Sequence, residues 1–406
     1  MLNWADRFSI FSFLNGHDYP ANRSFPVYLA VGARRSVALR PGHSFDSLKA
    51  FFNEKPSWLF GHISYDLMAD TLGVSTRHEV DPGFGYGFFF EPEILIQISA
   101  DAVMIEGAED PYALLAEINN CPSEIKNNGS VSPVATLTKE SYIGMITQIQ
   151  RHIRRGDCYE LNYCIPFKAE GASLDPVSLF SDLMRMAPNP FSALYKLQDH
   201  YCICASPERF LQKKGRRVIS QPMKGTAPRS DDPVVDEANR QSLAQNVKER
   251  SENVMIVDLV RNDLSRVSSR GSVAVEELFG VYSFPFVHQM VSTIQAVAEE
   301  GVHWADILAS CFPMGSMTGA PKKRVAELID LYEPVSRGLF SGSIGYIDPA
   351  GDFDFNVVIR SLFYNKEATI IKFWAGSGIT HKSHPEREYE ECLLKARALI
   401  RILEGK

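Results

Sequence analysis

The sequence has no block of basic residues that would offset its acidic balance. Its 406 residues contain 42 lysines and arginines against 49 aspartates and glutamates, so the formal net charge is −7. A nucleic acid binds largely through its phosphates, and an acidic chain without a basic stripe gives that contact little support. We therefore expect no nucleic-acid partner. We expect any small anion to bind at a local site made of an arginine, backbone amides or a metal ion.

The sequence also lacks a membrane span, a secretion signal and a paired cysteine motif. Its longest uncharged run, 278–298, is interrupted by Pro285, His288 and several hydroxyl side chains, which is typical of buried protein. The first sixteen residues have no basic start, so they do not resemble a signal peptide. Seven cysteines without a C-x-x-C pair are typical of reduced thiols and give no zinc site. We expect a cytoplasmic protein without membrane contact.

One composition shift divides the chain. Residues 121–137 are rich in proline, serine, asparagine and glycine, which interrupts the apolar periodicity. We place the boundary here, between an N-terminal region, residues 1–135, and a C-terminal region, residues 136–406. Directly after it, the spacing predicts a helix that Thr138 caps and Gly156 ends.

Strands and helices do not alternate in a regular βαβ rhythm, which favours an α+β fold with antiparallel strands and helices outside. The predicted strands are 93–99, 357–364 and 369–374, with a turn at 348–351, and the predicted helices are 236–263, 321–332 and 386–403.

Two pairs of glutamates stand three residues apart within predicted helices. The pairs are Glu249 with Glu252 and Glu388 with Glu391. Residues three apart share a helix face, so each pair can direct two carboxylates at one point. Two such pairs can hold a hard divalent cation such as Mg²⁺. The alternative is that each pair lies on an ordinary solvated helix face.

Glu208 and Lys224 are separated by sixteen residues with a charged turn, KKGRR, between them. This pattern predicts a hairpin that brings both side chains to one end. A lysine between Pro222 and Gly225 sits on constrained backbone, which suits a positioned nucleophile or base. A solvent-exposed lysine remains open as an alternative, as does an ion pair of Glu208 with Arg209.

Three further features suit anion binding. Gly376 and Gly378 follow a predicted strand and can expose backbone N–H groups, as can 319–321 at the start of a helix. Arg360 ends the run DFDFNVVIR on the polar face of its alternation, which suits bidentate binding of a carboxylate. A plain turn and a solvent-exposed arginine are the alternatives.

Together these segments resemble the chorismate-utilising enzyme family. The matching motifs occur in the family's order and are GDCYELN, SPERFL, QPMKGTAPR, ENVMIVDLVRNDL, GAPKKR, GSIGYI with NVVIRSL, and AGSGI followed by E-x-x-E and Lys395. The resemblance implies two large antiparallel β-sheets packed as a sandwich with helices outside, and an N-terminal region packed into the same unit.

The resemblance also implies a site. Mg²⁺ would link the carboxylate of chorismate to four glutamates, and other positions would bind substrate carboxylate groups or act in catalysis. The metal positions are Glu249, Glu252, Glu388 and Glu391; the substrate positions are Thr226, Arg360, Gly376 and Gly378; and His288 matches an active-site histidine.

The residue between Met223 and Gly225 indicates the branch of the family. Members that form anthranilate carry alanine there, and Lys224 instead resembles the branch that makes 4-amino-4-deoxychorismate. A lysine amine can attack C2 of the ring while Glu208 protonates the departing C4 hydroxyl, and ammonia then displaces the lysine. We expect Mg²⁺ and Arg360 to lower the pKa of Lys224 so that it is neutral when it attacks.

Glu160 departs from the family pattern. It stands where ammonia-using members carry glutamine and water-adding members carry lysine, so water addition is disfavoured while ammonia or ammonium can still be bound. Phe340 stands where anthranilate-forming relatives carry tyrosine. Because no G-x-C-x-G elbow surrounds any cysteine, we expect ammonia from a separate glutamine amidotransferase subunit. An anthranilate-forming enzyme and a non-catalytic chorismate-binding subunit are the alternatives.

Overall fold

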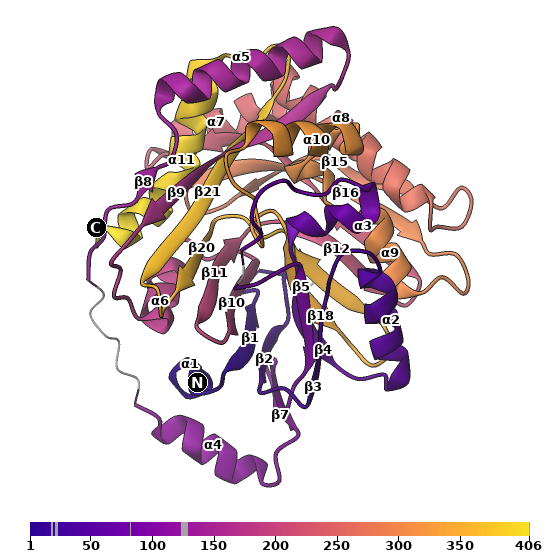
Figure 1. Ribbon diagram of the computed structural model, residues 1–406, viewed down its shortest axis with the longest axis vertical. Helices are drawn as coiled ribbons and strands as arrows, with labels where there is room; N and C mark the ends of the chain where they lie inside the picture. Colours follow the sequence, from indigo (N-terminus) through magenta and orange to yellow (C-terminus); the bar gives the residue numbers. More distant parts are fainter. Residues whose placement is uncertain (18, 21–22, 82, 123–128, 406) are drawn as a thin grey trace.

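Strands from both ends of the chain pair in two antiparallel sheets (Figure 1). The computed structural model describes residues 1–406 except 18, 21–22, 82, 123–128 and 406. The predicted boundary at 121–137 therefore lies partly outside the described residues.

The first sheet runs in the order β17 (Gly319–Ala320), β9 (Glu160–Ala169), β21 (Ile370–Ile379), β20 (Ser361–Asn365), β11 (His200–Ser206), β10 (Phe191–Leu197), β1 (Ile10–Asn15), β2 (Val27–Val31), β6 (Ile94–Ile98) and β7 (Val103–Glu106), with β8 (Val134–Ala135) paired to β9.

The second sheet runs in the order β14 (Met223–Pro228), β16 (Val287–Val297), β13 (Arg217–Gln221), β12 (Arg209–Lys214), β19 (Phe353–Asn356), β18 (Ser343–Ile347), β4 (Leu59–Ile63), β5 (Gly87–Glu91) and β3 (Arg35–Ala38), with β15 (Ala274–Ser283) paired to β16. Residues of the N-terminal region thus contribute strands to both sheets.

The helices are α1 (Leu2–Ala5), α2 (Ser44–Glu54), α3 (Met68–Leu72), α4 (Pro111–Asn120), α5 (Lys139–Arg155), α6 (Pro176–Met186), α7 (Pro233–Gln245), α8 (Val247–Ser265), α9 (Trp304–Cys311), α10 (Lys322–Tyr332) and α11 (Pro385–Leu403), with short 3₁₀ turns η2 (Tyr65–Leu67) and η3 (Gly315–Met317).

Two apolar cores hold these layers together. One core lies between the sheets and combines Tyr195 of β10 with Phe60 of β4 and Phe355 of β19. The other packs the opposite face of the first sheet against helices, with Ile146 of α5 and Leu399 of α11 among its buried side chains. Burying a side chain of this size contributes roughly 1.5–3 kcal/mol. The predicted sandwich of two antiparallel sheets with helices outside is therefore confirmed.

Local sequence signals placed several helices correctly. The Thr138 hydroxyl accepts a hydrogen bond from the Ser141 amide at the start of α5, and Gly156 ends the helix with φ of 83°. The helices predicted at 321–332 and 386–403 are α10 and α11, each displaced by one residue at its start.

Two predicted elements were wrong in detail. The single helix predicted at 236–263 is two helices, because Asn246 leaves the helical conformation and its side chain caps α8 by accepting from the amides of Lys248 and Glu249. The strand predicted at 357–364 is interrupted: β19 ends at Asn356, and β20 begins only at Ser361.

The described helices include none with the length and apolar character needed to cross a membrane. The uncharged run 278–298 instead forms most of the hairpin of β15 and β16. All seven cysteines are free thiols.

Candidate active site

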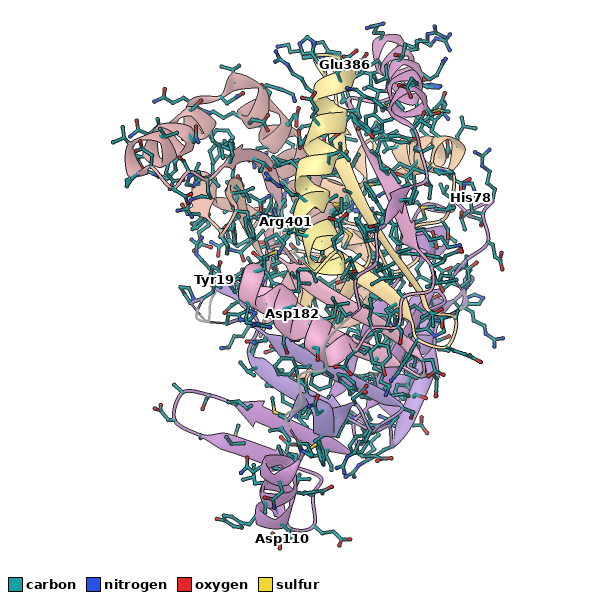
Figure 2. The ribbon with its side chains drawn as sticks, turned by 90° about the vertical axis from the view of Figure 1, so that its left-hand side faces the viewer. Tyr19, His78, Asp110, Asp182, Glu386 and Arg401 are labelled. Atoms are coloured by element: carbon teal, nitrogen blue, oxygen red, sulfur yellow. The ribbon has the colours of Figure 1, made fainter. Side chains whose placement is uncertain are left out.

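A cavity lies between the end of the β12–β13 hairpin and the strand β21, with the start of α8 and the middle of α11 at its wall. It encloses about 870 Å³ of empty space including its open mouth. Figure 2 shows α11 lying along the side of the molecule, with Glu386 near one end and Arg401 toward the other. Most of the predicted site residues line this cavity: Glu208, Lys224, Thr226, Glu249, Glu252, Arg360, Gly376, Gly378 and Glu391.

The hairpin explains why Glu208 and Lys224 meet. Arg209 at the start of β12 pairs with Gln221 at the end of β13, so the residues that flank this pair emerge at the same end. Arg209 does not neutralise Glu208. Its guanidinium is fully buried and binds Asp354 instead, with Nε and Nη2 each donating to a carboxylate oxygen at 2.9 Å. The predicted hairpin is confirmed, and the alternative of a Glu208–Arg209 pair is excluded.

Glu208 is held in a form that can donate a proton. Its side chain is 3% exposed, and burial raises its pKa to about 7, although Ser316 and Lys224 oppose the increase. A carboxyl group with a pKa near neutrality is suited to general acid catalysis.

Lys224 forms an ion pair with Glu160, and both side chains are buried. Burial alone would lower the pKa of Lys224, but the charges of Glu160 and Glu252 outweigh it and raise the pKa. The opposing cation is Lys395. In the protein without metal or substrate, two carboxylates therefore stabilise the ammonium, and the lowering expected from Mg²⁺ and Arg360 stays a prediction.

Gly378 makes room for this ion pair. A Cβ atom at Gly378 would lie 2.8 Å from Glu160 Oε1 and 3.0 Å from Lys224 Nζ, so a larger residue would displace one of them. Gly376, two residues earlier in β21, is equally confined, since its Cβ would lie 2.4 Å from Cys164 Sγ. By contrast, Gly319 and Ala320 form the short strand β17 beside β9 and do not line this cavity, so the anion site predicted at 319–321 stays a prediction.

Arg360 reaches the cavity because the chain leaves the strand. It lies in the loop between β19 and β20 with φ of 53°, a left-handed conformation that no alternating strand would contain. Burial lowers its pKa to about 10, against the opposing charge of Glu208. Among the described residues, none accepts a hydrogen bond from the Arg360 guanidinium or forms an ion pair with it. The predicted polar strand face was wrong, but an arginine free to bind a carboxylate is what the structure contains.

The four predicted metal ligands lie on α8 and α11, and they are paired with lysines. Lys248 Nζ lies 3.3 Å from Glu388, 3.5 Å from Glu252 and 3.9 Å from Glu249. Lys395 Nζ lies 2.8 Å from Glu391 and donates to the carbonyl oxygen of Gly376. Within the described part of the chain, no three carboxylate, histidine or cysteine groups converge closely enough to form a metal cluster.

Two observations nevertheless fit a cation. Glu252 Oε1 and Glu388 Oε2 are buried oxygens without a hydrogen-bond donor, and unsatisfied buried acceptors are uncommon. Burial and the charge of Glu160 raise the pKa of Glu252 to about 8, although Lys248 and Lys224 oppose the increase. The donor set, carboxylate oxygen alone, is the one that Mg²⁺ prefers.

His288 does not line the cavity. On β16 it alternates with Gln289, which does, so its ring lies on the other side of the strand. Nε2 lies 3.0 Å from Asp236 of α7, and Nδ1 lies 2.9 Å from the Ser283 hydroxyl. In this position His288 ties β16 to α7.

Sequence reasoning missed Lys248 and gave Lys395 no role. The only signal for Lys248 was its spacing of four residues from Glu252, which is common on helix surfaces. The stacked pair of Phe340 and Trp374, with ring centroids 5.4 Å apart, also lines the cavity and was not foreseen.

Comparison with known proteins decides the family. The profile of the family described as chorismate binding enzyme matches residues 31–401. The chain belongs to this family. It is an enzyme of the chorismate-utilising kind, and residues from several of the motifs seen in the sequence line the cavity.

Several curated relatives are similar to this chain over most of its length. Aminodeoxychorismate synthase component 1 of Klebsiella aerogenes is 36% identical over 350 residues, which cover 85% of this chain and 77% of the relative. Alignments with other proteins of that name span 59% of their length. Anthranilate synthase component 1 of Thermus thermophilus is 31% identical over 412 residues, 93% of this chain and 88% of the relative.

The solved structure of anthranilate synthase component I from Streptococcus pneumoniae shares the fold. It superimposes with a TM-score of 0.81 over 96% of this chain and 95% of that chain, at 23% sequence identity. At this identity the likeness supports the architecture alone.

Proposed function

We propose that this chain aminates chorismate with ammonia to 4-amino-4-deoxychorismate, as the names of its aminodeoxychorismate synthase relatives indicate for them. The observation that carries the proposal is Lys224 beside Glu208 in one cavity, because this reaction needs a nucleophile and an acid on one substrate.

Lys224 attacks C2 of the ring, and the bond between C4 and its hydroxyl breaks. Glu208 gives its proton to the departing oxygen, so water leaves instead of hydroxide. Ammonia then attacks C4 while the bond from C2 to the lysine nitrogen breaks, which frees Lys224. The sum is chorismate plus ammonia giving the amine plus water, and the proton lost by the attacking ammonia replaces the one that Glu208 gave.

Before this attack Lys224 must lose a proton, and Glu160 is the base in contact with it. Once Lys224 is neutral, the second oxygen of Glu160, which has no hydrogen-bond partner among the described residues, can accept from ammonia or ammonium. Arg360, Thr226, Gly376 and Gly378, which line the same cavity, hold the substrate carboxylates.

Glu252 and Glu388 would hold Mg²⁺, with Glu249 and Glu391 beside them, and the ion would neutralise and orient a substrate carboxylate when bound. Without a cation these acidic side chains would repel a dicarboxylate substrate.

Ammonia would come from a separate glutamine amidotransferase subunit, since the relatives are named as component 1 of their enzymes. A cytoplasmic location remains the expectation from the free cysteines.

An anthranilate-forming activity is the second candidate, favoured by similarity to the Thermus protein over 93% of this chain. Lys224 and Phe340 argue against it. Incubation with chorismate, Mg²⁺ and ammonium salt separates the two. We expect a product that becomes p-aminobenzoate only after a lyase is added. Direct release of anthranilate would refute the proposal.

The same incubation tests a non-catalytic role. Chorismate binding in calorimetry without any turnover, even at high ammonium concentration, would favour a subunit that binds the substrate without converting it. The presence of a buried acid and a buried lysine in the cavity speaks against that outcome.

A further inference from the structure

The ammonium of Lys248 lies among the carboxylates that suit a metal ion. Lys248 is the second residue of α8, where the cap by Asn246 fixes the backbone of both Lys248 and Glu249. Its Nζ contacts Glu249 and Glu252 of its own helix and Glu388 of α11, so one ammonium joins the two helices.

A cation stabilises these carboxylates whenever they are ionised. The side chains of Glu252 and Glu388 are 8% and 3% exposed, and leaving such charges unpaired is costly. Lys248 supplies one charge to three carboxylates, and it leaves Glu252 Oε1 and Glu388 Oε2 without hydrogen bonds. One ammonium therefore only partly satisfies the site.

Lys248 can also leave. Its side chain is 33% exposed and lines the cavity, and its four-carbon stem allows the ammonium to swing toward solvent. In contrast, the ammonium of Lys395 is fixed by both Glu391 and the carbonyl oxygen of Gly376.

We propose that Lys248 is a resident cation that holds the carboxylates of α8 and α11 together until a divalent ion displaces it. This inference rests on the magnesium site of the proposed function. Because Mg²⁺ must displace Lys248, the lysine weakens metal binding in the absence of substrate. A dicarboxylate substrate in the same cavity gives the displaced ammonium a new partner, so substrate and metal strengthen each other's binding.

The test is calorimetric titration of the full chain with Mg²⁺ alone, at constant ionic strength. Lys248→Met removes the charge and keeps the length of the side chain. We expect it to bind Mg²⁺ about tenfold more tightly than the unaltered chain, because no internal cation competes. Lys214→Met is the matched control: Lys214 is exposed at the turn of the β12–β13 hairpin and contributes nothing to the cavity.

Addition of chorismate provides the second measurement. In the unaltered chain chorismate should tighten Mg²⁺ binding, and in Lys248→Met this gain should shrink to a small fraction. An unchanged Mg²⁺ affinity in Lys248→Met, or weaker binding, would overturn the proposal.

Thermal unfolding separates the role of Lys248 from a general loss of structure. Without Mg²⁺, Lys248→Met should unfold about 3 °C lower than the unaltered chain, and saturating Mg²⁺ should abolish the difference. An equal loss with and without Mg²⁺ would count against a cation role. Where the methionine variant does not fold, Lys248→Gln takes its place, and Lys248→Arg, which keeps the charge, should not tighten Mg²⁺ binding.

The experiments distinguish a wrong role for Lys248 from a wrong proposed function. Amination is judged by the product formed from chorismate and ammonium, whereas the role of Lys248 is judged by Mg²⁺ affinity and by unfolding temperature. If the unaltered chain binds no Mg²⁺ at all, the magnesium site and the role of Lys248 both fall, and the product assay still decides the reaction.

Discussion

Lys224 and Glu160 form a buried ion pair that joins β14 of the second sheet to β9 of the first. The pair places the proposed nucleophile in contact with the residue that departs from the family pattern. It also keeps the lysine protonated, since the charge of Glu160 raises its pKa. Whatever removes that proton controls how much of the enzyme is ready to react.

Replacing the nucleophile tests the covalent step directly. In Lys224→Ala we expect synthase activity to fall about 10³-fold or more, because the first bond to C2 cannot form. Intact mass spectrometry of the unaltered chain with chorismate, in the absence of ammonium, should detect an adduct that Lys224→Ala lacks. Lys214→Ala serves as the control and should match the unaltered chain. Full activity in Lys224→Ala would eliminate the covalent mechanism.

Removing the charge of Glu160 should shift the pH profile. Glu160→Gln takes away the carboxylate that raises the pKa of Lys224, so the pKa falls and the neutral amine is present at lower pH. The limb of kcat/KM that rises with pH should therefore move to lower pH. Glu170→Gln, which removes an exposed partner of Lys168, should leave the profile in place. A profile that stays in place in Glu160→Gln as well would show that another group holds the lysine proton.

Ionisation of Glu208 should produce the other limb of the pH profile, in which the rate falls as pH rises. Burial raises its pKa to about 7, so the carboxyl group is protonated below that pH and ionised above it. A general acid is active only when protonated, and the rate should fall as pH rises through about 7. Glu208→Gln should lose this limb and about a hundredfold or more of the rate. A descending limb that persists in Glu208→Gln would assign it to another residue.

The protonation states that the two residues need are opposite to those that the free protein favours. The proposed mechanism needs Lys224 neutral and Glu208 protonated, while the pKa values of the free protein favour the ammonium and, above about pH 7, the carboxylate. A positive charge near Glu252 would lower the pKa of Lys224, because Glu252 is one of the carboxylates that raise it. Cation binding is thus linked to the readiness of the nucleophile.

Chelation and one substitution test that link. EDTA should abolish turnover, and added Mg²⁺ should restore it. Glu388→Gln should weaken Mg²⁺ binding by roughly 10–100-fold, as measured by calorimetry, because a buried carboxylate on α11 is lost. Glu386 lies in the exposed first turn of the same helix (Figure 2), so the variant Glu386→Gln should bind Mg²⁺ normally. Equal Mg²⁺ affinity in both variants would exclude Glu388 as a ligand.

The sequence predicted those parts of the site that depend on local signals. Caps and apolar periodicity placed α5 and α11, and the spacing of three residues correctly paired Glu388 with Glu391 on one helix. The pairing of Glu388 with Lys248 was not predictable, because it depends on where the fold places α8 relative to α11.

The loop that carries Arg360 was missed for a similar reason. Alternation of apolar and polar residues continues through Asn356, so the pattern predicts one strand. Asn356 is in fact buried, where it accepts from the Ile344 amide and donates to the Phe191 carbonyl oxygen. Polar residues satisfied by partners from distant strands look the same in sequence as polar residues facing water.

Arg209 of β12 forms an ion pair with Asp354 of β19, and loss of this pair should lower the stability of the fold. Both side chains are fully buried, and the arginine also donates to Gln221 of β13. Asp354→Ala would leave a buried guanidinium without its counter-charge, so we expect the free energy of unfolding to fall by about 3–5 kcal/mol. Denaturant unfolding measures this change. Glu237→Ala, which removes the partner of Arg240 on the surface of α7, is the matched control and should unfold at the same denaturant concentration as the unaltered chain. If both variants lost the same stability, burial would not be what gives the Arg209 pair its importance.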